Sequence, residues 1–159
     1  MASIEQLQVL FQELGPATEG ISEVYQDAAG QWGVVFHETT GIILEFDPEQ
    51  QKLILTTELG APPADRRLET YELLLISNYA RSETGGISMA LNGPQGEVTQ
   101  MYELNTADLT LQTLQAVLVN FAAKSEFWKE AVAQGIPHEQ EEKAELEEVA
   151  AGDFQFMRV

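Results

Sequence analysis

Histidine is the side chain that most often acts as a general base near neutral pH, and this sequence contains two, His37 and His138. His37 stands where a predicted strand meets a turn, and His138 stands at the start of an acidic stretch. Both positions favour solvated side chains over catalytic ones. The chain has no cysteine, so it offers no thiolate nucleophile and no cysteine-containing zinc site.

Sequence motifs for phosphate, acyl-transfer and metal chemistry are missing. No serine stands in a G-x-S-x-G motif, and neither a G-x-x-x-x-G-K-S/T nor a G-x-G-x-x-G phosphate-binding loop occurs. The chain also lacks H-E-x-x-H and the calcium loop that begins D-x-D/N-x-D/N-G. We therefore expect no cofactor, no metal site and no enzymatic activity.

Carboxylates are the one reactive side-chain type in abundance. Glu45 and Asp47 stand two residues apart on one predicted strand face, a candidate acid–base pair, although a charged face toward water explains them at least as well. The glutamates between Glu139 and Glu148 could collect divalent cations, but a solubilising charge run is the better explanation. An enzyme that uses carboxylates alone is the third and weakest hypothesis.

The overall composition indicates one acidic globular domain. The chain has 159 residues, 44% hydrophobic and 21% charged, which is close to ordinary globular usage. Its 26 acidic residues outnumber eight basic ones, for a formal charge of −18, and such a surface repels phosphate backbones and anionic lipids. The sequence disfavours nucleic acid as a partner and membrane insertion. Because it shows no signal peptide, we expect a protein of the cytoplasm.

The first predicted element is an amphipathic helix over residues 3–14. Ser3 is its N-cap, and Gln6 three residues later completes a capping box. Val9 points away from the apolar stripe of this helix, and Leu10 lies at its edge. The helix therefore has more apolar surface than one docking face requires.

Three strand-like runs follow, at residues 32–37, 41–47 and 52–59, separated by short turns. Such short connections predict an antiparallel meander. Residues 17–31 are small and polar, and we expect a connection there with at most a short strand over residues 21–25.

A second helix is predicted over residues 65–78, with Asp65 as its N-cap. One side of it is expected to carry Leu68, Tyr71, Leu74, Leu75 and Asn78. Its run Leu73-Leu74-Leu75-Ile76 is apolar over more than one face. We therefore expect a cover on two sides, its own sheet on one and another subunit as the candidate for the other.

Two further strands and a long helix complete the pattern. Residues 87–91 and 98–104 alternate as strands around a turn at residues 92–96, and the last helix begins at Asp108 or Thr110. The sequence thus predicts an α+β fold in the order α-βββ-α-ββ-α. It has a twisted antiparallel sheet of five to six strands and three main helices.

The chain divides into an α/β domain of residues 1–137 and an acidic C-terminal extension of residues 138–159. The extension ends with Phe154 and Phe156 close to the terminus. It is a solubilising tail, a separate docking element or an intramolecular cover.

Apolar strips on a strongly acidic carrier favour binding over catalysis, because net charge resists self-aggregation while the strips stay available to a partner. Several local strings and their order add to this. They are the first helix ending Leu14-Gly15, a strand ending Leu59-Gly60-Ala61-Pro62, the helix ending Leu74-Leu75-Ile76-Ser77-Asn78, the strand Gly85-Gly86-Ile87-Ser88-Met89-Ala90-Leu91, and the last helix with Leu118-Val119-Asn120-Phe121 and Phe127-Trp128.

From about residue 3 to residue 132, this series of elements resembles the class I chaperones of bacterial type III secretion systems, the CesT or Tir-chaperone family. The resemblance implies a homodimer that works without ATP in the bacterial cytoplasm. It would bind the N-terminal chaperone-binding segment of a secreted effector protein, keep that segment extended and soluble, and present it to the secretion ATPase. Such a partner adds a strand to a sheet edge or lays a helix into a groove.

The resemblance also assigns surfaces on this chain. The dimer interface falls on the second long helix and the last strand pair, with ordinary core packing as the competing role; the candidates are Tyr71, Leu75, Tyr79, Met89, Leu91 and Tyr102. Effector contacts fall on the first helix and the early strands, at Val9, Leu10, Val35, Phe36, Ile43 and Ile54. Alternation does not say which strand face points outward, so about half of these are equally assignable to the core. The alternative function is a non-secretory protein-binding regulator or antitoxin-like module of similar fold, which would bind a folded partner.

Overall fold

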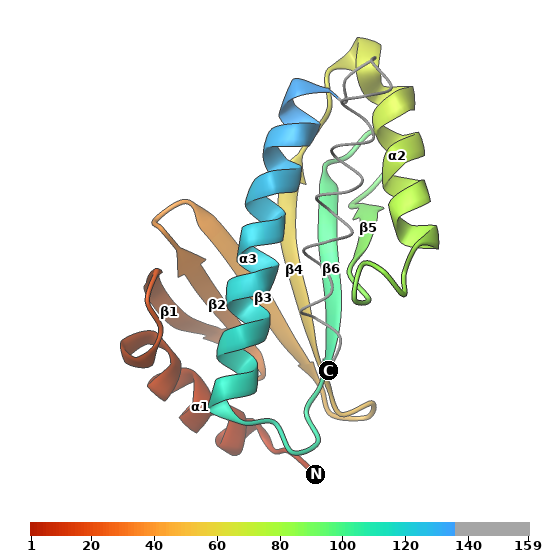
Figure 1. The fold of residues 1–159 in the computed structure, drawn as a ribbon. Coiled ribbons are helices and arrows are strands. Elements are labelled where there is room, and N and C mark those ends of the chain that lie inside the picture. The colour runs from red at the N-terminus through yellow and green to blue at the C-terminus, as the bar shows by residue number, and fades with distance from the viewer. Residues whose placement is uncertain (136–159) are drawn as a thin grey trace. The chain divides into compact units, whose positions relative to one another are not determined.

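The computed structural model describes residues 1–135, and these form an α+β fold (Figure 1). The helices are α1 (Ile4–Ala17), α2 (Arg67–Tyr79) and α3 (Leu111–Gln134), and the short 3-10 helix η1 (Ala64–Arg66) precedes α2. The strands are β1 (Ile21–Ala28), β2 (Gln31–Phe36), β3 (Thr40–Asp47), β4 (Lys52–Gly60), β5 (Ser88–Leu91) and β6 (Val98–Asn105). They form a six-stranded sheet in the order β1-β2-β3-β4-β6-β5, so the predicted fold class is confirmed.

The described chain separates into two compact units. Unit 1 comprises residues 1–57 and 102–122, and unit 2 comprises residues 58–101 together with residues from 123 onward. The predicted boundary at residue 137, the acidic extension and His138 all lie outside the described residues. The division into a domain and an extension therefore stays a prediction.

Helix α1 begins where the sequence predicts. The Gln6 N–H donates to Ser3 Oγ at 3.2 Å, and the Ser3 N–H donates to Gln6 Oε1 at 3.0 Å, which completes the capping box. The helix does not stop at Leu14-Gly15 but continues to Ala17. Its buried residues are Leu7, Phe11 and Leu14.

Strand β1 is longer than the sequence predicts. It occupies eight residues of the stretch expected to be mainly a connection, and it pairs with β2 in antiparallel register. Most of its side chains are exposed, and the register shifts between Ile21 and Glu23 and again between Gln26 and Ala28. A strand at the edge of a sheet with an irregular register shows little apolar alternation, which explains why the prediction was wrong here.

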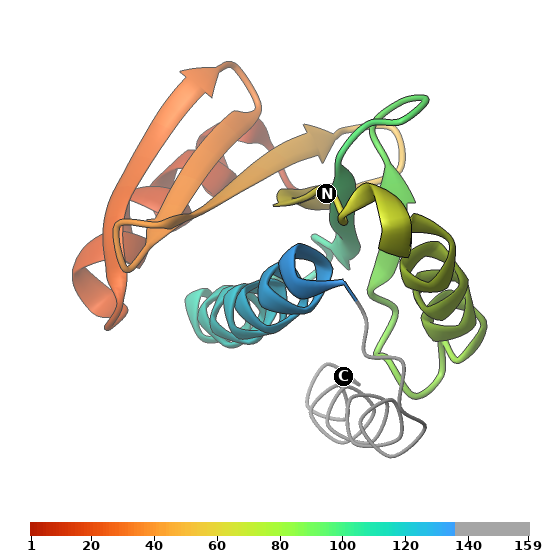
Figure 2. The ribbon, with the colours of Figure 1, turned by 90° about the horizontal axis from the view of Figure 1, so that it is seen from above.

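The sheet in unit 1 has one buried face. Its side chains are Trp32, Val34, Phe36, Ile42, Leu44, Phe46, Leu53 and Leu55. Helix α1 lies beside the strands of this unit (Figure 2). It packs against the buried face, where the Phe11 ring stacks on Trp32 with centroids 4.5 Å apart. The alternation predicted for β3 and β4 is confirmed by their burial patterns.

The start of α3 was predicted correctly, but the N-cap of α2 was not. Asp65 lies in η1, and the N-cap of α2 is Arg66, whose side chain makes no capping bond, so the prediction for Asp65 was wrong. At α3, the Thr113 N–H donates to Thr110 Oγ1 at 3.2 Å. Thr110 is therefore the N-cap, one of the two predicted starts.

Unit 2 buries a cationic side chain. Lys124 on α3 is 3% exposed, and loss of hydration lowers its pKa to about 8. An unfolded lysine keeps its proton up to a pKa of about 10.4. The native and unfolded states therefore bind different numbers of protons between these two pH values.

We predict that folding stability rises with pH between about 8 and about 10, because the unfolded state binds more protons than the native state in that window. Below the window the cost of burying charged Lys124 is fully present. Urea unfolding of the wild type and of Lys124→Met, measured across the window, checks this. The rise should appear in the wild type and be absent from the variant, and equal pH profiles would contradict the assignment.

Candidate functional site

The outward face of the sheet in unit 1 carries apolar side chains from four strands. We call Tyr25, Val35, Ile43 and Ile54 the outer sheet face. The strand register places Tyr25 opposite Gly33 and Gly33 opposite Ile43, so Tyr25 and Ile43 lie in one row across β1, β2 and β3. Val35, Ile43 and Ile54 are half-buried, and Tyr25 is exposed.

The sequence-based prediction of this face was wrong at one residue and missed another. Phe36, predicted among the effector contacts, lies on the buried face and is 2% exposed, so it belongs to the core. Tyr25 was not predicted, because β1 was not recognised as a full strand. Its ring covers Gly33, where any side chain would collide with it, whereas a Cβ at Gly41 would meet open space.

A second apolar surface in unit 1 surrounds α1. Val9 is 53% exposed and Leu10 half-buried, and both line an open hollow of about 650 Å³. Hydrogen bonds hold its rim: the Ala2 N–H donates to Gln51 Oε1 at 2.7 Å, and the Thr106 hydroxyl donates to the Gln51 carbonyl at 2.8 Å. Met1, Leu7 and Leu109 also line the hollow. The exposure expected for Val9 is confirmed.

Helix α2 in unit 2 is apolar on two opposite faces. Its buried residues are Thr70, Leu73 and Leu74, and only Leu74 among them belongs to the predicted side. The opposite face carries Leu68, Leu75, Ile76 and Tyr79, which we call the α2 strip. Leu68 is 77% exposed, Leu75 67% and Tyr79 94%, and their spacing of seven and four residues places them in one line along the helix.

The predicted dimer residues are spread over both units. Four of them, Tyr71, Leu75, Met89 and Leu91, line a hollow of about 180 Å³ beside α2 and β5. Met89 is buried and Leu91 exposed. Tyr102 lies on β6 in unit 1, half-buried, and burial raises the pKa of its hydroxyl. The sequence reading did not include Leu68 and Ile76 in the interface, although their helical spacing to Tyr79 could have indicated them.

An amide clamp joins helix α2 to β5. The Asn78 side chain donates to the Met89 carbonyl at 2.8 Å, and the Met89 N–H donates to Asn78 Oδ1 at 2.8 Å. Asn78 thus takes the place of a neighbouring strand at the edge of the sheet, and Figures 1 and 2 show α2 beside β5. This pairing satisfies both backbone groups of Met89.

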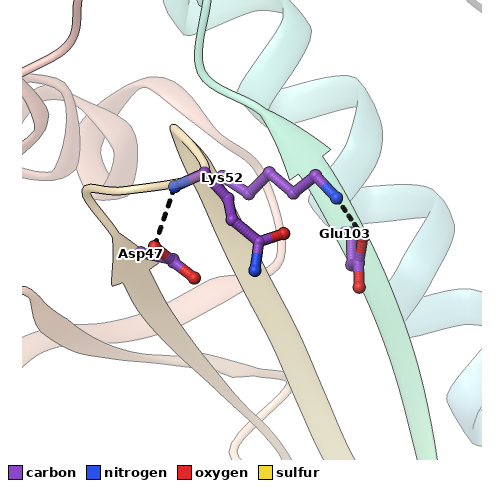
Figure 3. Close-up of polar contacts among 4 residues, drawn as sticks. Asp47, Lys52 and Glu103 are labelled. Carbon is purple, nitrogen blue, oxygen red and sulfur yellow. Dashed lines mark hydrogen bonds and ion pairs between the residues drawn. The ribbon is translucent and has the colours of Figure 1, made fainter.

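The described residues give no support to carboxylate catalysis. Asp47 closes the β3–β4 turn (Figure 3), where its Oδ1 accepts the Glu49 and Gln50 N–H groups at 2.9 Å each. Glu45 is exposed. His37 is exposed as well. Within residues 1–135, His, Asp and Glu form no group of three suited to a metal ion. In the same range no helix is both long and apolar enough to cross a membrane.

Comparison with known proteins gives a family and a fold. Residues 9–129 match the Tir chaperone protein (CesT) family. A search of curated proteins finds no match.

Three solved structures share the fold. A chain of the ExsC–ExsE complex aligns with a TM-score of 0.68 and 21% identity, over 84% of this chain and 98% of its own length. A chain of the HopA1–SchA chaperone–effector complex gives 0.64 and 16%, over 82% and 100%. A chain from the Yersinia pestis type III secretion chaperone SycH in complex with a stable fragment of YscM2 gives 0.56 and 21%, over 74% and 95%.

We predict that Asn78→Leu lowers the free energy of unfolding by about 1–3 kcal/mol, because it leaves the Met89 N–H and carbonyl without their amide partner. Ser77→Ala, one residue earlier on the same helix, is the control and should change it by less than about 0.5 kcal/mol. Urea denaturation measures both, and amide hydrogen exchange should accelerate at Met89 in Asn78→Leu alone. Unchanged exchange at Met89 would show that the clamp does not hold the β5 edge.

Proposed function

The chain belongs to the Tir chaperone protein (CesT) family, and from that premise we propose that it is a type III secretion chaperone of the bacterial cytoplasm. In this proposal it binds the N-terminal segment of a secreted effector as a homodimer, without ATP and without catalysis. It keeps the segment soluble and extended until delivery to the secretion ATPase.

The observation that carries the proposal is that residues 1–135 leave apolar surfaces exposed in both units of a strongly acidic chain. Unit 1 has the outer sheet face and the hollow beside α1, and unit 2 has the α2 strip. A monomer gains nothing from leaving such surfaces in water, whereas a chaperone needs them for its partner and its second copy. The formal charge of −18 limits non-specific association of these surfaces.

The α2 strip supports a homodimer. Its three large exposed residues, Leu68, Leu75 and Tyr79, are aligned on one side of a helix whose other side is already buried. A two-fold axis beside α2 would pair the strip with itself, as isologous interfaces require. The hollow lined by Tyr71 and Leu91 would receive side chains from the second copy.

The outer sheet face and the hollow beside α1 support binding of an unfolded segment. Val35, Ile43 and Ile54 are offered by three adjacent strands, and β1 lies at the end of the strand order with an open edge. An extended segment can pair with such an edge and place alternate side chains on the sheet or in a hollow. The large contact area offsets the entropy lost when the segment becomes ordered.

We predict a solution mass near twice 17.6 kDa by light scattering, stable across a dilution series. Leu75→Glu combined with Tyr79→Glu should give a monomer, because it places like charges opposite each other at the two-fold axis. Val119→Glu, which changes an exposed aliphatic residue of α3 in unit 1, is the control and should stay dimeric. A wild type that is monomeric at every concentration would exclude the proposed dimer.

We predict that coexpression with a secreted effector from the same bacterium yields a complex that is lost when the N-terminal segment of the effector is deleted. Ile43→Asp should reduce recovery of the complex by at least about tenfold, because a carboxylate on the outer sheet face loses its hydration against the bound segment. Val119→Asp is the matched control and should leave recovery unchanged. Affinity purification of the tagged chain measures all three.

Full binding of the truncated effector would contradict the proposal. It would instead favour the alternative, a non-secretory regulator or antitoxin-like module that recognises a folded partner.

A further inference from the structure

Within residues 1–135, acidic residues are distributed unevenly between the two units. Unit 1 contains eleven Asp and Glu residues and a single basic residue, Lys52. The described part of unit 2, residues 58–101 and 123–135, contains eight acidic and five basic residues. Lys52 is already engaged, since its Nζ lies 2.6 Å from Glu103 Oε2 (Figure 3). Unit 1 therefore presents a field of one sign.

The strand register brings part of this charge onto the outer sheet face. Glu23 lies opposite Val35, and Glu45 lies opposite Ile54. Both carboxylates are exposed and point to the same side of the sheet as their apolar partners. Apolar and acidic side chains thus alternate across the four strands.

The same face has a place for an incoming side chain. Gly41 lies opposite Val35 and two residues before Ile43, and a Cβ built there meets no atom within 4 Å. The Gly41 backbone is therefore open between two aliphatic side chains. An apolar side chain of a bound segment can occupy this position.

Charge distinguishes among the chain segments that could bind to this face. A second copy of the chain carries a formal charge of −18. Residues 136–159 of the chain itself contain seven acidic and two basic residues. Both would meet the carboxylates of unit 1 with charge of the same sign, which is unfavourable. A cationic segment from a different protein meets no such repulsion.

We propose that the segment bound on the outer sheet face is extended and positively charged, with apolar residues alternating with Lys or Arg. This inference rests on the proposed chaperone function and specifies its partner. Alternate side chains of an extended chain point to opposite sides at a repeat of two residues. The apolar set then contacts Val35, Ile43 and the Gly41 position, while the long cationic side chains reach back to Glu23 and Glu45.

Three synthetic peptides test the proposal. They share the same alternating apolar residues and a central Pro that prevents self-association, and their polar positions are all Lys, all Gln or all Glu. Fluorescence anisotropy with the full chain should show the Lys peptide binding at least about tenfold more tightly than the Gln peptide, and the Glu peptide least. The difference between Lys and Gln peptides should shrink as salt is raised.

Matched variants test whether Glu23 and Glu45 cause the preference for the Lys peptide. Glu23→Lys combined with Glu45→Lys should remove the preference for the Lys peptide. Asp65→Lys combined with Glu83→Lys makes the same change in net charge in unit 2, at two exposed residues, and should retain the preference. Gly41→Val fills the open position without touching the buried face, and should weaken binding of the Lys and Gln peptides alike.

Several outcomes would overturn the inference. Equal affinity for the Lys and Gln peptides would do so, as would equal loss in the two double variants or failure of every peptide to bind. Each of these leaves the chaperone proposal to its own test, since deletion of the effector's N-terminal segment reports on that function whatever the charge of the segment.

Discussion

Successive side chains of a strand point to opposite sides of a sheet, and this constraint governs what unit 1 can do. Once Trp32 stacks on Phe11 of α1, one side of β2 is committed to the core, and the antiparallel register commits the same side of β3 and β4. Val35, Ile43 and Ile54 are then outward whatever their hydrophobicity. The apolar character of the outer sheet face is thus not a consequence of core packing, and the proposed partner would account for it.

Helix α2 likewise buries one apolar face and leaves a second apolar face exposed. Its inner face is used by Thr70, Leu73 and Leu74, and the Asn78 clamp fixes the helix along β5, so rotation cannot exchange one apolar face for the other. Within the described residues 1–135, Leu68, Leu75 and Tyr79 therefore stay exposed. A self-complementary contact is the simplest way to cover a straight apolar line on a helix that is already fixed on its other side.

The sequence was informative where a local rule decided the structure. The capping box at Ser3, the Thr110 N-cap and the alternation of β3 and β4 all depend on residues within a few positions of one another. It was less informative where distant packing decided. In Trp32-Gly33-Val34-Val35-Phe36 both alternating sets contain apolar residues, and only the stack on Phe11 selects the inner one. This is why Phe36 was assigned to the surface.

The edge strand and the start of the second helix were predicted incorrectly, each for its own reason. β1 has mainly exposed polar residues, so it carries no alternation signal, and the Tyr25 ring over Gly33 depends on a cross-strand pairing. At α2, the N-cap signal of Asp65 was overridden by the preceding η1 turn. The apolar run from Leu73 to Ile76 did indicate two apolar sides, but not which residues lie on each side.

The distribution of charge fits the two proposed contacts in opposite ways. A homodimer brings identical surfaces together, so an interface is favoured where like charges are few, and α2 belongs to unit 2, whose described part has five basic residues against eight acidic ones. Binding of a foreign segment has no such restriction, and strong charge of one sign speeds its capture and excludes partners of the same sign. Unit 1, with one engaged lysine, is the part of the described chain suited to that task. In these two proposals the acidity of unit 1 favours cationic partners and disfavours anionic ones, whereas in the described part of unit 2, where self-association is proposed, basic residues offset more of the acidic charge.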